Sequence, residues 1–296
     1  MKHLFFLLLT LMMINSATTF AASNAPSGGF VEALQMPAWY EREGRSYPLT
    51  AGTEIHTNDI IRTGKNARVL LRMQEGSIIK LGEDARLNIK NLQTPQQKTD
   101  LFTALLRVTR GAFRFTTTEL GTNRSRKVDV QIGAVTIGIR GTDIWGRSSP
   151  NEDLFALLEG KVTVQRDNET AFIMQDKLSY ILAPKNQPTT SVTPIDLNEL
   201  NDWANETEIQ AGRGILTSNG QWAVNMMSLQ NTEAADKLLQ KLNEAGYASQ
   251  IQQTKIGNTR WLRIRIEGFV TREDANSFAS DIDDRFGINQ PWVVKF

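Results

Sequence analysis

Residues 222–296 contain the same strand–helix pattern twice, and the second copy begins 40 residues after the first. In each copy apolar residues first alternate with polar ones, as on a half-buried strand, and then follow the spacing of an amphipathic helix. This repeat predicts two matching strand–helix units that share one core. The matched apolar positions are Val224 and Ile264, Met226 and Ile266, Leu229 and Phe269, Ala235 and Ala275, Leu238 and Phe278, and Leu242 and Ile282.

Both predicted helices carry start and stop signals. Asn231 and Thr271 are suitable N-caps, because a short polar side chain at that position accepts a hydrogen bond from a free backbone N–H. Gly246 and Gly287 follow the two helices, and glycine is the residue that most readily takes the left-handed conformation at a helix end. We therefore expect the helices to stop at these glycines.

Further strands are expected at 247–256 and 291–296, which gives the order βαββαβ. This order predicts an α+β, ferredoxin-like domain over residues 221–296, in which two helices cover one face of a small sheet. The other face of the sheet is left free, so it is the first candidate for a binding surface.

Residues 1–21 have the pattern of a secretory signal peptide: Lys2, an apolar run from Leu4 to Ile14, and small residues before a cleavage site after Ala21. The apolar run is shorter than the roughly 20 residues that a membrane-spanning helix needs, although an uncleaved anchor is the alternative. No later segment is apolar enough to cross a membrane. We expect an exported, periplasmic protein with no transmembrane segment in the mature chain.

The composition excludes several kinds of chemistry. The chain has no cysteine, so it has no lipid-attachment cysteine, disulfide or thiolate site. Cleavage of the signal removes His3 and leaves His56, which lies in a turn-like segment, as the only histidine. One histidine in a turn cannot form a multi-histidine metal site and is a poor candidate for a histidine-based catalytic triad. We expect no metal and no cofactor.

A glycan-cleaving enzyme would need two carboxylates held at a set distance across its substrate. The adjacent acid pairs of this chain, Glu83-Asp84, Glu152-Asp153 and Asp283-Asp284, lie in predicted turns or on a helix surface, where neighbouring residues face different ways. Solvated surface acids are the better explanation, so we expect no enzymatic activity.

The pattern of residues 28–185 predicts an all-β domain, either a sandwich or a roll. Short alternating apolar runs recur there at close spacing with glycine-containing turns between them. Residues 100–109 are the exception, because their pattern is also compatible with a helix. The lysines and arginines of this segment are scattered rather than gathered on one helix. Together with export, this argues against a nucleic-acid partner.

Several motifs of this segment resemble the FecR-like domain. The resemblance implies a periplasmic β domain, known mainly from iron-uptake signalling, that serves as an interaction module. The chain departs from that pattern because it has neither a cytoplasmic segment that restrains a sigma factor nor a retained membrane helix, so only the β module carries over. The motifs are 49–52 (LTAG), 58–64 (NDIIRTG), 74–77 (QEGS), 110–111 (RG), 139–142 (IRGT) and 158–162 (LEGKV).

A segment rich in proline, threonine and serine, residues 183–194, separates the two parts. Its composition is typical of an extended linker. We expect a linker over 186–220 that contains a short helix within 196–210 and lets the two domains act separately.

The terminal unit resembles a SPOR domain over its whole length. The resemblance rests on 222–229 (WAVNMMSL), 263–269 (RIRIEGF) and 291–294 (PWVV). It implies binding of peptidoglycan, with a preference for glycan strands stripped of stem peptides, as arise at the division septum. The chain departs from the usual motif at Asn225, where glutamine is common, and at Met227, where glycine is common.

Alternation also predicts which side chains line the free face. If Val224 and Met226 point toward the helices, Asn225 and Met227 point away, and Trp261, Arg263 and Arg265 do the same on a later strand. Indole rings can stack on sugar rings, and guanidinium and amide groups can bond to their hydroxyls and carbonyls. The alternative is that the arginines pair with Glu267 on an ordinary solvated surface, and Trp292 could lie on either face. The predicted peptidoglycan-binding residues are Asn225, Ser228, Trp261, Arg263, Arg265 and Trp292.

These observations predict a non-catalytic periplasmic protein of the cell envelope. Its terminal domain would bind glycan strands of peptidoglycan, in particular denuded strands, and could act in cell division at the septum. Its FecR-like domain would be an interaction module. The alternative function is an envelope scaffold or regulator that acts through protein partners of the FecR-like domain.

Overall fold

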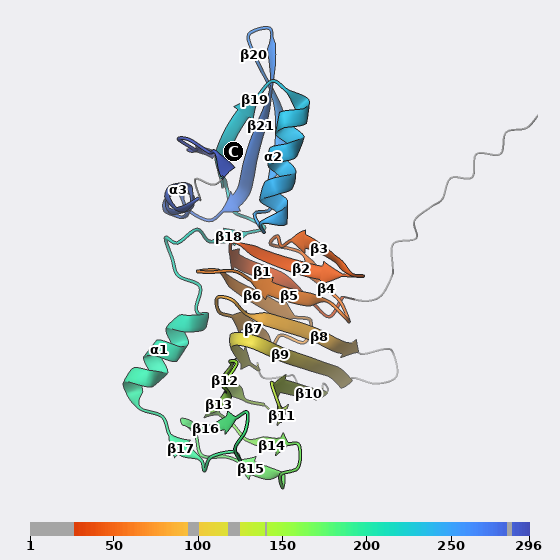
Figure 1. The fold of residues 1–296 in the computed structure, drawn as a ribbon, viewed down its shortest axis with the longest axis vertical. Helices are drawn as coiled ribbons and strands as arrows, with labels where there is room; N and C mark the ends of the chain where they lie inside the picture. The colour runs from red at the N-terminus through yellow and green to blue at the C-terminus, as the bar shows by residue number, and fades with distance from the viewer. Residues whose placement is uncertain (1–26, 94–100, 118–124, 140, 283–285) are drawn as a thin grey trace, which may run out of the picture.

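The computed structural model of the 296-residue chain describes residues 27–93, 101–117, 125–139, 141–282 and 286–296. The predicted signal peptide and the acid pair Asp283-Asp284 lie outside these residues. The described residues form a mostly β structure with three helices (Figure 1). None of these helices is long and apolar enough to cross a membrane.

The larger part of the fold is built from short strands. These strands are β1 (Gly29–Gln35), β2 (Ala38–Arg42), β3 (Arg45–Pro48), β4 (Glu54–Ile55), β5 (Ile60–Thr63), β6 (Arg68–Met73), β7 (Ile78–Leu81), β8 (Arg86–Gln93), β9 (Leu101–Thr116), β10 (Ser125–Ile132), β11 (Val135–Ile139), β12 (Asp143–Ser148), β13 (Glu152–Glu159), β14 (Val162–Arg166), β15 (Phe172–Met174), β16 (Ser179–Pro184) and β17 (Thr193–Pro194).

The remaining elements belong to the connecting segment and to the C-terminal unit. They are α1 (Leu197–Thr207), β18 (Leu216–Thr217), β19 (Trp222–Leu229), α2 (Thr232–Glu244), β20 (Gln250–Ile256), β21 (Thr259–Phe269), α3 (Arg272–Asp281) and β22 (Trp292–Lys295).

The long strand β9 joins two sheets. Its residues 101–110 pair with β8 and, in parallel, with β10, while residues 111–116 pair with β7 and β12. Gly111 lies at the change of sheet with a φ of +78°, and a Cβ there would lie 2.5 Å from Cα of Ala85. A glycine is therefore required at this bend.

The helix that the pattern of residues 100–109 also allowed is not formed, because residues 101–109 belong to β9. Phe102, Ala104, Leu106 and Val108 are buried at every second position, which is the period of a strand. Apolar side chains from both sheets meet in one continuous core. Every helix or strand that the structure describes before α1 is a strand, as predicted for residues 28–185.

Helix α1 packs on the outer face of the sheet that contains β12 and β13. The indole of Trp203 stacks on that of Trp145, with ring centroids 5.0 Å apart and planes 8° from parallel. Glu206 pairs with Arg147 at 2.8 Å, and Glu208 pairs with Lys80 and Arg114. The helix is therefore fixed to the β domain by both stacking and charge.

The C-terminal unit has the element order strand, helix, strand, strand, helix, strand. Its strands form an antiparallel sheet in the order β20, β21, β19, β22. Side chains of α2 and α3, including Ala235, Leu242, Ala275 and Phe278, are buried with the alternate apolar residues of β19 and β21. Both helices therefore cover one face of the sheet.

The helix ends agree with the sequence in three places of four. Oδ1 of Asn231 accepts a hydrogen bond from N–H of Ala234 at 2.8 Å, and Thr271 caps α3 in the same way at 3.0 Å. Gly246 follows α2 with a φ of +83°. Helix α3, however, ends at Asp281 and not at Gly287, because Ile282 takes an extended conformation and its side chain is buried.

Residues 186–220 are not the free linker that their composition indicates. Besides α1, this segment contributes β18, in which Leu216 pairs with Leu34 of β1 on one side and with Phe269 of β21 on the other. Nε2 of Gln35 donates hydrogen bonds to the carbonyls of Gln210 and Arg213. One sheet therefore runs from the β domain into the C-terminal unit, and the two are held together (Figure 1).

Candidate functional site

The candidate site lies on the face of the C-terminal sheet that the helices leave free. Leu262, Ile264 and Ile266 of β21 are buried against the helices. Trp261, Arg263 and Arg265 alternate with them and therefore lie on the opposite face, as predicted. The row begins near the β20–β21 hairpin, which is the end of the unit far from the β domain (Figure 1).

The strand pairing places two further predicted residues in this row. Asn225 of β19 lies directly opposite Arg265 on one side and Trp292 of β22 on the other. Directly opposed residues of antiparallel strands share a face, so Trp292 lies on the free face. Its neighbour Val293 is opposite Val224 and packs on the core. The alternative in which Trp292 belongs to the core is therefore wrong.

An irregularity in β19 corrects the expected direction of Met227. The pairing register shifts between Asn225 and Met227, so that Met227 lies opposite Ile264 on the helix side and Ser228 lies opposite Arg263 on the free face. An extra residue at a bulge reverses the alternation that follows it. Ser228, and not Met227, thus continues the row.

Two arginine–aromatic pairs cross the row. The guanidinium of Arg263 lies over the ring of Trp292, with Cζ 5.5 Å from the ring centroid, and Arg265 lies over Phe296 at 5.3 Å. Both distances are in the range of cation–π attraction. Trp292 and Phe296 remain 38% and 59% exposed. Each pair therefore combines a partly exposed aromatic ring with a guanidinium group that lies over it.

Asn225 is buried beneath this layer. It is 0% exposed, and neither Oδ1 nor Nδ2 has a hydrogen-bond partner among the described residues. A buried amide without a partner costs about 1–3 kcal/mol, and such groups are rare in folded proteins. The predicted outward direction is correct, but the expected solvent exposure is wrong, because the side chains of neighbouring strands close over it.

Arg265 is also buried, at 3% exposed, where an exposed residue was expected. Its Nη1 donates to Oε1 of Gln252 at 2.7 Å, and its Nε lies 3.0 Å from Oε1 of Glu267. Burial lowers the pKa of Arg265 below its ordinary value, the charge of Arg263 adds to that effect, and Glu267 opposes it. The expected alternative pairing with Glu267 is thus present, although in a buried setting.

Trp261 forms the outer end of the row. It lies opposite Thr254 of β20 and is half-buried. Arg265 lies four positions further along the extended strand, which is a distance of about 13 Å. The full row from Trp261 to Glu267 is about 20 Å long, which is enough for several rings of a linear ligand.

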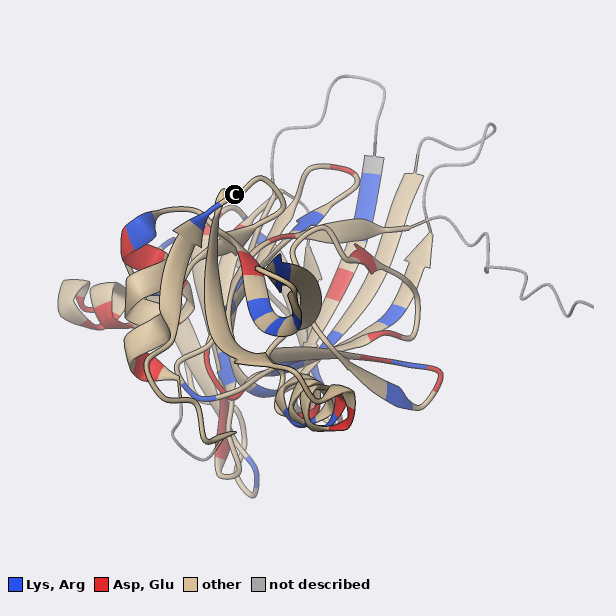
Figure 2. Cartoon of the chain, turned by 90° about the horizontal axis from the view of Figure 1, so that it is seen from above, with Lys and Arg blue, Asp and Glu red and all other residues tan. Residues whose placement is uncertain are grey.

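The chemistry of the row suits a polar ligand with flat apolar faces. It offers aromatic rings for stacking, guanidinium groups as donors and one unpartnered amide as both donor and acceptor. Its one carboxylate, Glu267, is paired with Arg265. Across the described residues, no cluster of three or more histidine, cysteine, aspartate or glutamate residues could hold a metal ion. Seen from above, as in Figure 2, the positive and negative residues of the described chain are interspersed.

Phe296 was missed by the sequence analysis. It follows Trp292 by four residues, which places both side chains on one face of an extended strand. That spacing was a usable signal. Gln252 was also missed, because its role depends on the pairing of β20 with β21.

Comparison with known proteins gives two family matches. Residues 59–163 match the family described as FecR protein, and residues 218–295 match the family described as SPOR domain, in the predicted order. Two crystal structures of a candidate anti-sigma factor from Parabacteroides distasonis ATCC 8503 align with 80% of this chain at 12% identity. The alignments cover 98% and 99% of those chains, with TM-scores of 0.39 and 0.38. No curated protein matches the sequence.

Proposed function

The chain carries a FecR domain followed by a SPOR domain, and from this we propose that it is a non-catalytic protein of the periplasm that binds peptidoglycan. The ligand is the glycan strand, in particular the strand stripped of stem peptides. The binding surface is the free face of the SPOR sheet, whose strand order supports a ferredoxin-like arrangement. The FecR domain serves as an interaction module.

One observation supports this proposal above all: a buried amide with no partner among the described residues lies beside one member of each of the two arginine–aromatic pairs. Asn225 lies between Arg265 and Trp292 in the sheet, and Arg263 covers Trp292. A sugar ring stacked on the exposed indole can place its hydroxyl and N-acetyl groups toward these donors and acceptors. The binding energy then includes relief of the unpaired amide.

The test is co-sedimentation of the chain without residues 1–21 with purified sacculi. Simultaneous replacement of Asn225, Trp261 and Arg263 by alanine should weaken sedimentation by at least about tenfold in Kd, because a loss of 1.4 kcal/mol already has that effect. The matched control is Lys237→Ala, which removes one exposed cation from α2 on the other side of the sheet. Equal sedimentation of the triple variant and the parent would refute the site.

Septal enrichment is a separate part of the proposal. An exported fluorescent fusion of the chain should concentrate at midcell, where denuded strands are expected, and the triple variant should be evenly distributed along the envelope. A midcell signal that survives the triple substitution would show that a different surface directs localisation.

A second candidate function is an envelope scaffold or regulator that binds a protein through the FecR domain. It is favoured by a cavity of about 300 Å³ between α1 and the sandwich, which Trp203, Leu178 and Leu200 help to line. Leu178 of this lining and Leu197, on the same helix as Leu200, are both exposed. Pull-down with the parent and with a Leu178→Asp/Leu197→Asp variant distinguishes the two functions. A partner that the parent retains and the variant loses supports the scaffold.

A further inference from the structure

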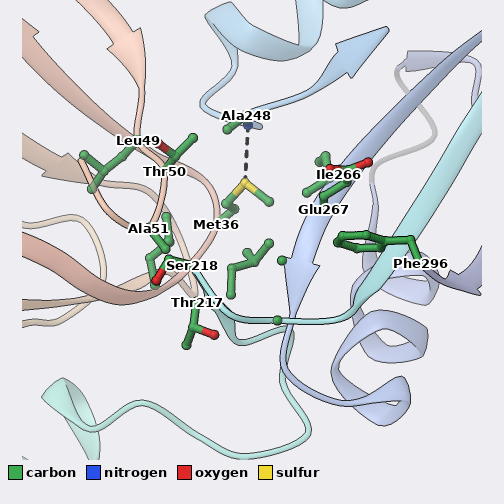
Figure 3. A pocket seen from close by; sticks show the side chains of 14 residues that line it. Met36, Leu49, Thr50, Ala51, Thr217, Ser218, Ala248, Ile266, Glu267 and Phe296 are labelled. Atoms are coloured by element: carbon green, nitrogen blue, oxygen red, sulfur yellow. Dashed lines mark hydrogen bonds between the residues drawn. The ribbon is translucent and has the colours of Figure 1, made fainter. Parts of the chain in front are cut away.

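A cavity of about 240 Å³ lies where the FecR domain meets the SPOR domain (Figure 3). The FecR domain contributes Met36 and the segment Leu49–Ala51, and the SPOR domain contributes Glu267 and Phe296. This volume lies below the roughly 300–1,000 Å³ of pockets that hold a drug-sized ligand, so it suits about one sugar ring.

The cavity is continuous with the free face of the SPOR sheet. Glu267 and Phe296 line it, and the same two side chains hold Arg265, by an ion pair at 3.0 Å and by ring stacking at 5.3 Å. The row that begins at Trp261 therefore runs along β21 and ends in this cavity. A linear ligand on the row would have its last unit there.

The far side of the cavity is closed by the FecR domain and the connecting segment. Strand β18 crosses the end of β21 through the pairing of Leu216 with Phe269, and it is itself paired with β1. N–H of Ala248 donates to Sδ of Met36 at 3.3 Å above the cavity, as Figure 3 shows. A glycan strand that follows the row meets this wall and cannot continue straight beyond it.

The lining of the cavity suits a neutral sugar. Phe296 and Met36 provide apolar surface, and the hydroxyls of Thr50 and Ser218 together with the Glu267 carboxylate provide hydrogen-bonding groups. A carboxylate accepts hydrogen bonds from hydroxyls but repels an acidic group. The last sugar of a chain has one hydroxyl that internal sugars use in their linkage. A cavity that is walled at one end and carries hydrogen-bonding groups can therefore distinguish an end from an internal unit.

We propose that this protein recognises the end of a glycan strand, with the terminal neutral sugar held between the FecR and SPOR domains. The inference rests on the proposed function, since the row on the SPOR face must bind the sugars that precede the terminal one. It assigns the FecR domain a direct part in ligand binding through residues 49–51.

The experiment measures binding capacity against strand length. Denuded glycan strands are prepared at two average lengths, and the chain without residues 1–21 is titrated into equal masses of each. Recognition of ends predicts that a tenfold shorter preparation binds about ten times as much protein at saturation, because it has ten times as many ends per unit mass. Equal capacities would overturn the inference and leave the proposed function intact. Absence of binding to either preparation would overturn both.

Variants that fill the cavity provide the second readout. Ala51→Trp should reduce affinity for short strands by at least tenfold, and Ala211→Trp, the same change at an exposed position that does not line the cavity, should have no effect. Thermal unfolding shows whether each variant is folded. If Ala51→Trp does not fold, Ser218→Trp fills the cavity from its exposed rim. Unchanged affinity in a folded cavity-filling variant would overturn the inference.

Discussion

Asn225 combines complete burial with an amide that has no hydrogen-bond partner among the described residues. A residue with that combination lowers the stability of the free protein. Buried polar groups nearly always have a partner, so this amide marks a place where an ordered water or a ligand group can bind.

Replacement of Asn225 by leucine, which is close to it in size, should raise the free energy of unfolding by about 1 kcal/mol, because the desolvated amide is removed. The same variant should bind sacculi at least tenfold more weakly. Denaturant unfolding and co-sedimentation measure the two effects.

Asn243 is the matched control for this change. Its Oδ1 accepts hydrogen bonds from N–H and Oγ–H of Ser249 at 2.9 and 3.1 Å. Asn243→Leu should therefore lower stability. A loss of stability in both variants would show that the Asn225 amide is satisfied in the free protein.

Glu75 gives a prediction on pH. Burial raises the pKa of its carboxyl above the ordinary value, while Ser77 and the charge of Arg126 oppose the shift. At pH values below the unfolded-state pKa the carboxyl is neutral in both states, and stability is unaffected. As pH rises toward the folded-state pKa, ionisation favours the unfolded chain, so that stability falls.

The variant Glu75→Gln removes this titration. We therefore expect the free energy of unfolding of Glu75→Gln to rise relative to that of the parent between pH 4 and pH 7. Urea unfolding at several pH values measures this difference. A difference that does not change with pH would contradict the assignment of a raised pKa.

Alternation along β21 is enough to predict from the sequence that Trp261, Arg263 and Arg265 share one face. Their burial could not be predicted in the same way. The burial of Arg265 depends on Phe296 and Gln252, which reach it from other strands. The place of Ser228 depends on a bulge, and nothing in the local sequence marks it.

At the scale of elements, α1 shows what composition misses. The sequence predicts a short helix within 196–210, and α1 covers Leu197–Thr207. The stacking of Trp203 on Trp145 joins residues that are far apart in the chain, so no local pattern could reveal it. For the same reason the local sequence left a helix possible at 100–109, since the identity of β9 depends on the strands beside it.

Trp203→Ala should lower the free energy of unfolding by about 3 kcal/mol, the lower end of the range for loss of a buried aromatic side chain. Leu197→Ala on the same helix, where the side chain is 69% exposed, should change it by less than about 0.5 kcal/mol. Urea unfolding followed by tryptophan fluorescence measures both. Equal effects would mean that α1 does not pack as described.

At the scale of the whole molecule, the two domains share a sheet and a core. Buried side chains form one cluster that continues from the sandwich into the SPOR domain. Nε1 of Trp39 donates to the carbonyl of Glu244 at 2.9 Å, and a Cβ at Gly246 would lie 2.6 Å from the ring of Trp39. This close contact joins residues that are far apart in the chain, so the local sequence could not reveal it.

Because of this shared core, the chain should unfold in a single thermal transition. The double variant Gln35→Ala/Trp39→Ala removes two of the side chains that join the domains. It should weaken their coupling enough to separate unfolding into two transitions, measured by scanning calorimetry. Tyr47→Ala, an exposed aromatic on the neighbouring strand β3, is the control and should retain one transition. Two transitions in the parent would contradict the coupling.

The pairing of β18 with both β1 and β21 also has a geometric consequence. These pairings leave no hinge between the β domain and the SPOR domain. If the SPOR domain binds a glycan strand as proposed, the direction of that strand fixes the orientation of the β domain. Protein molecules bound to neighbouring glycan strands of the same direction would therefore share one orientation. They would then offer the α1 side of each molecule as an ordered array over the wall.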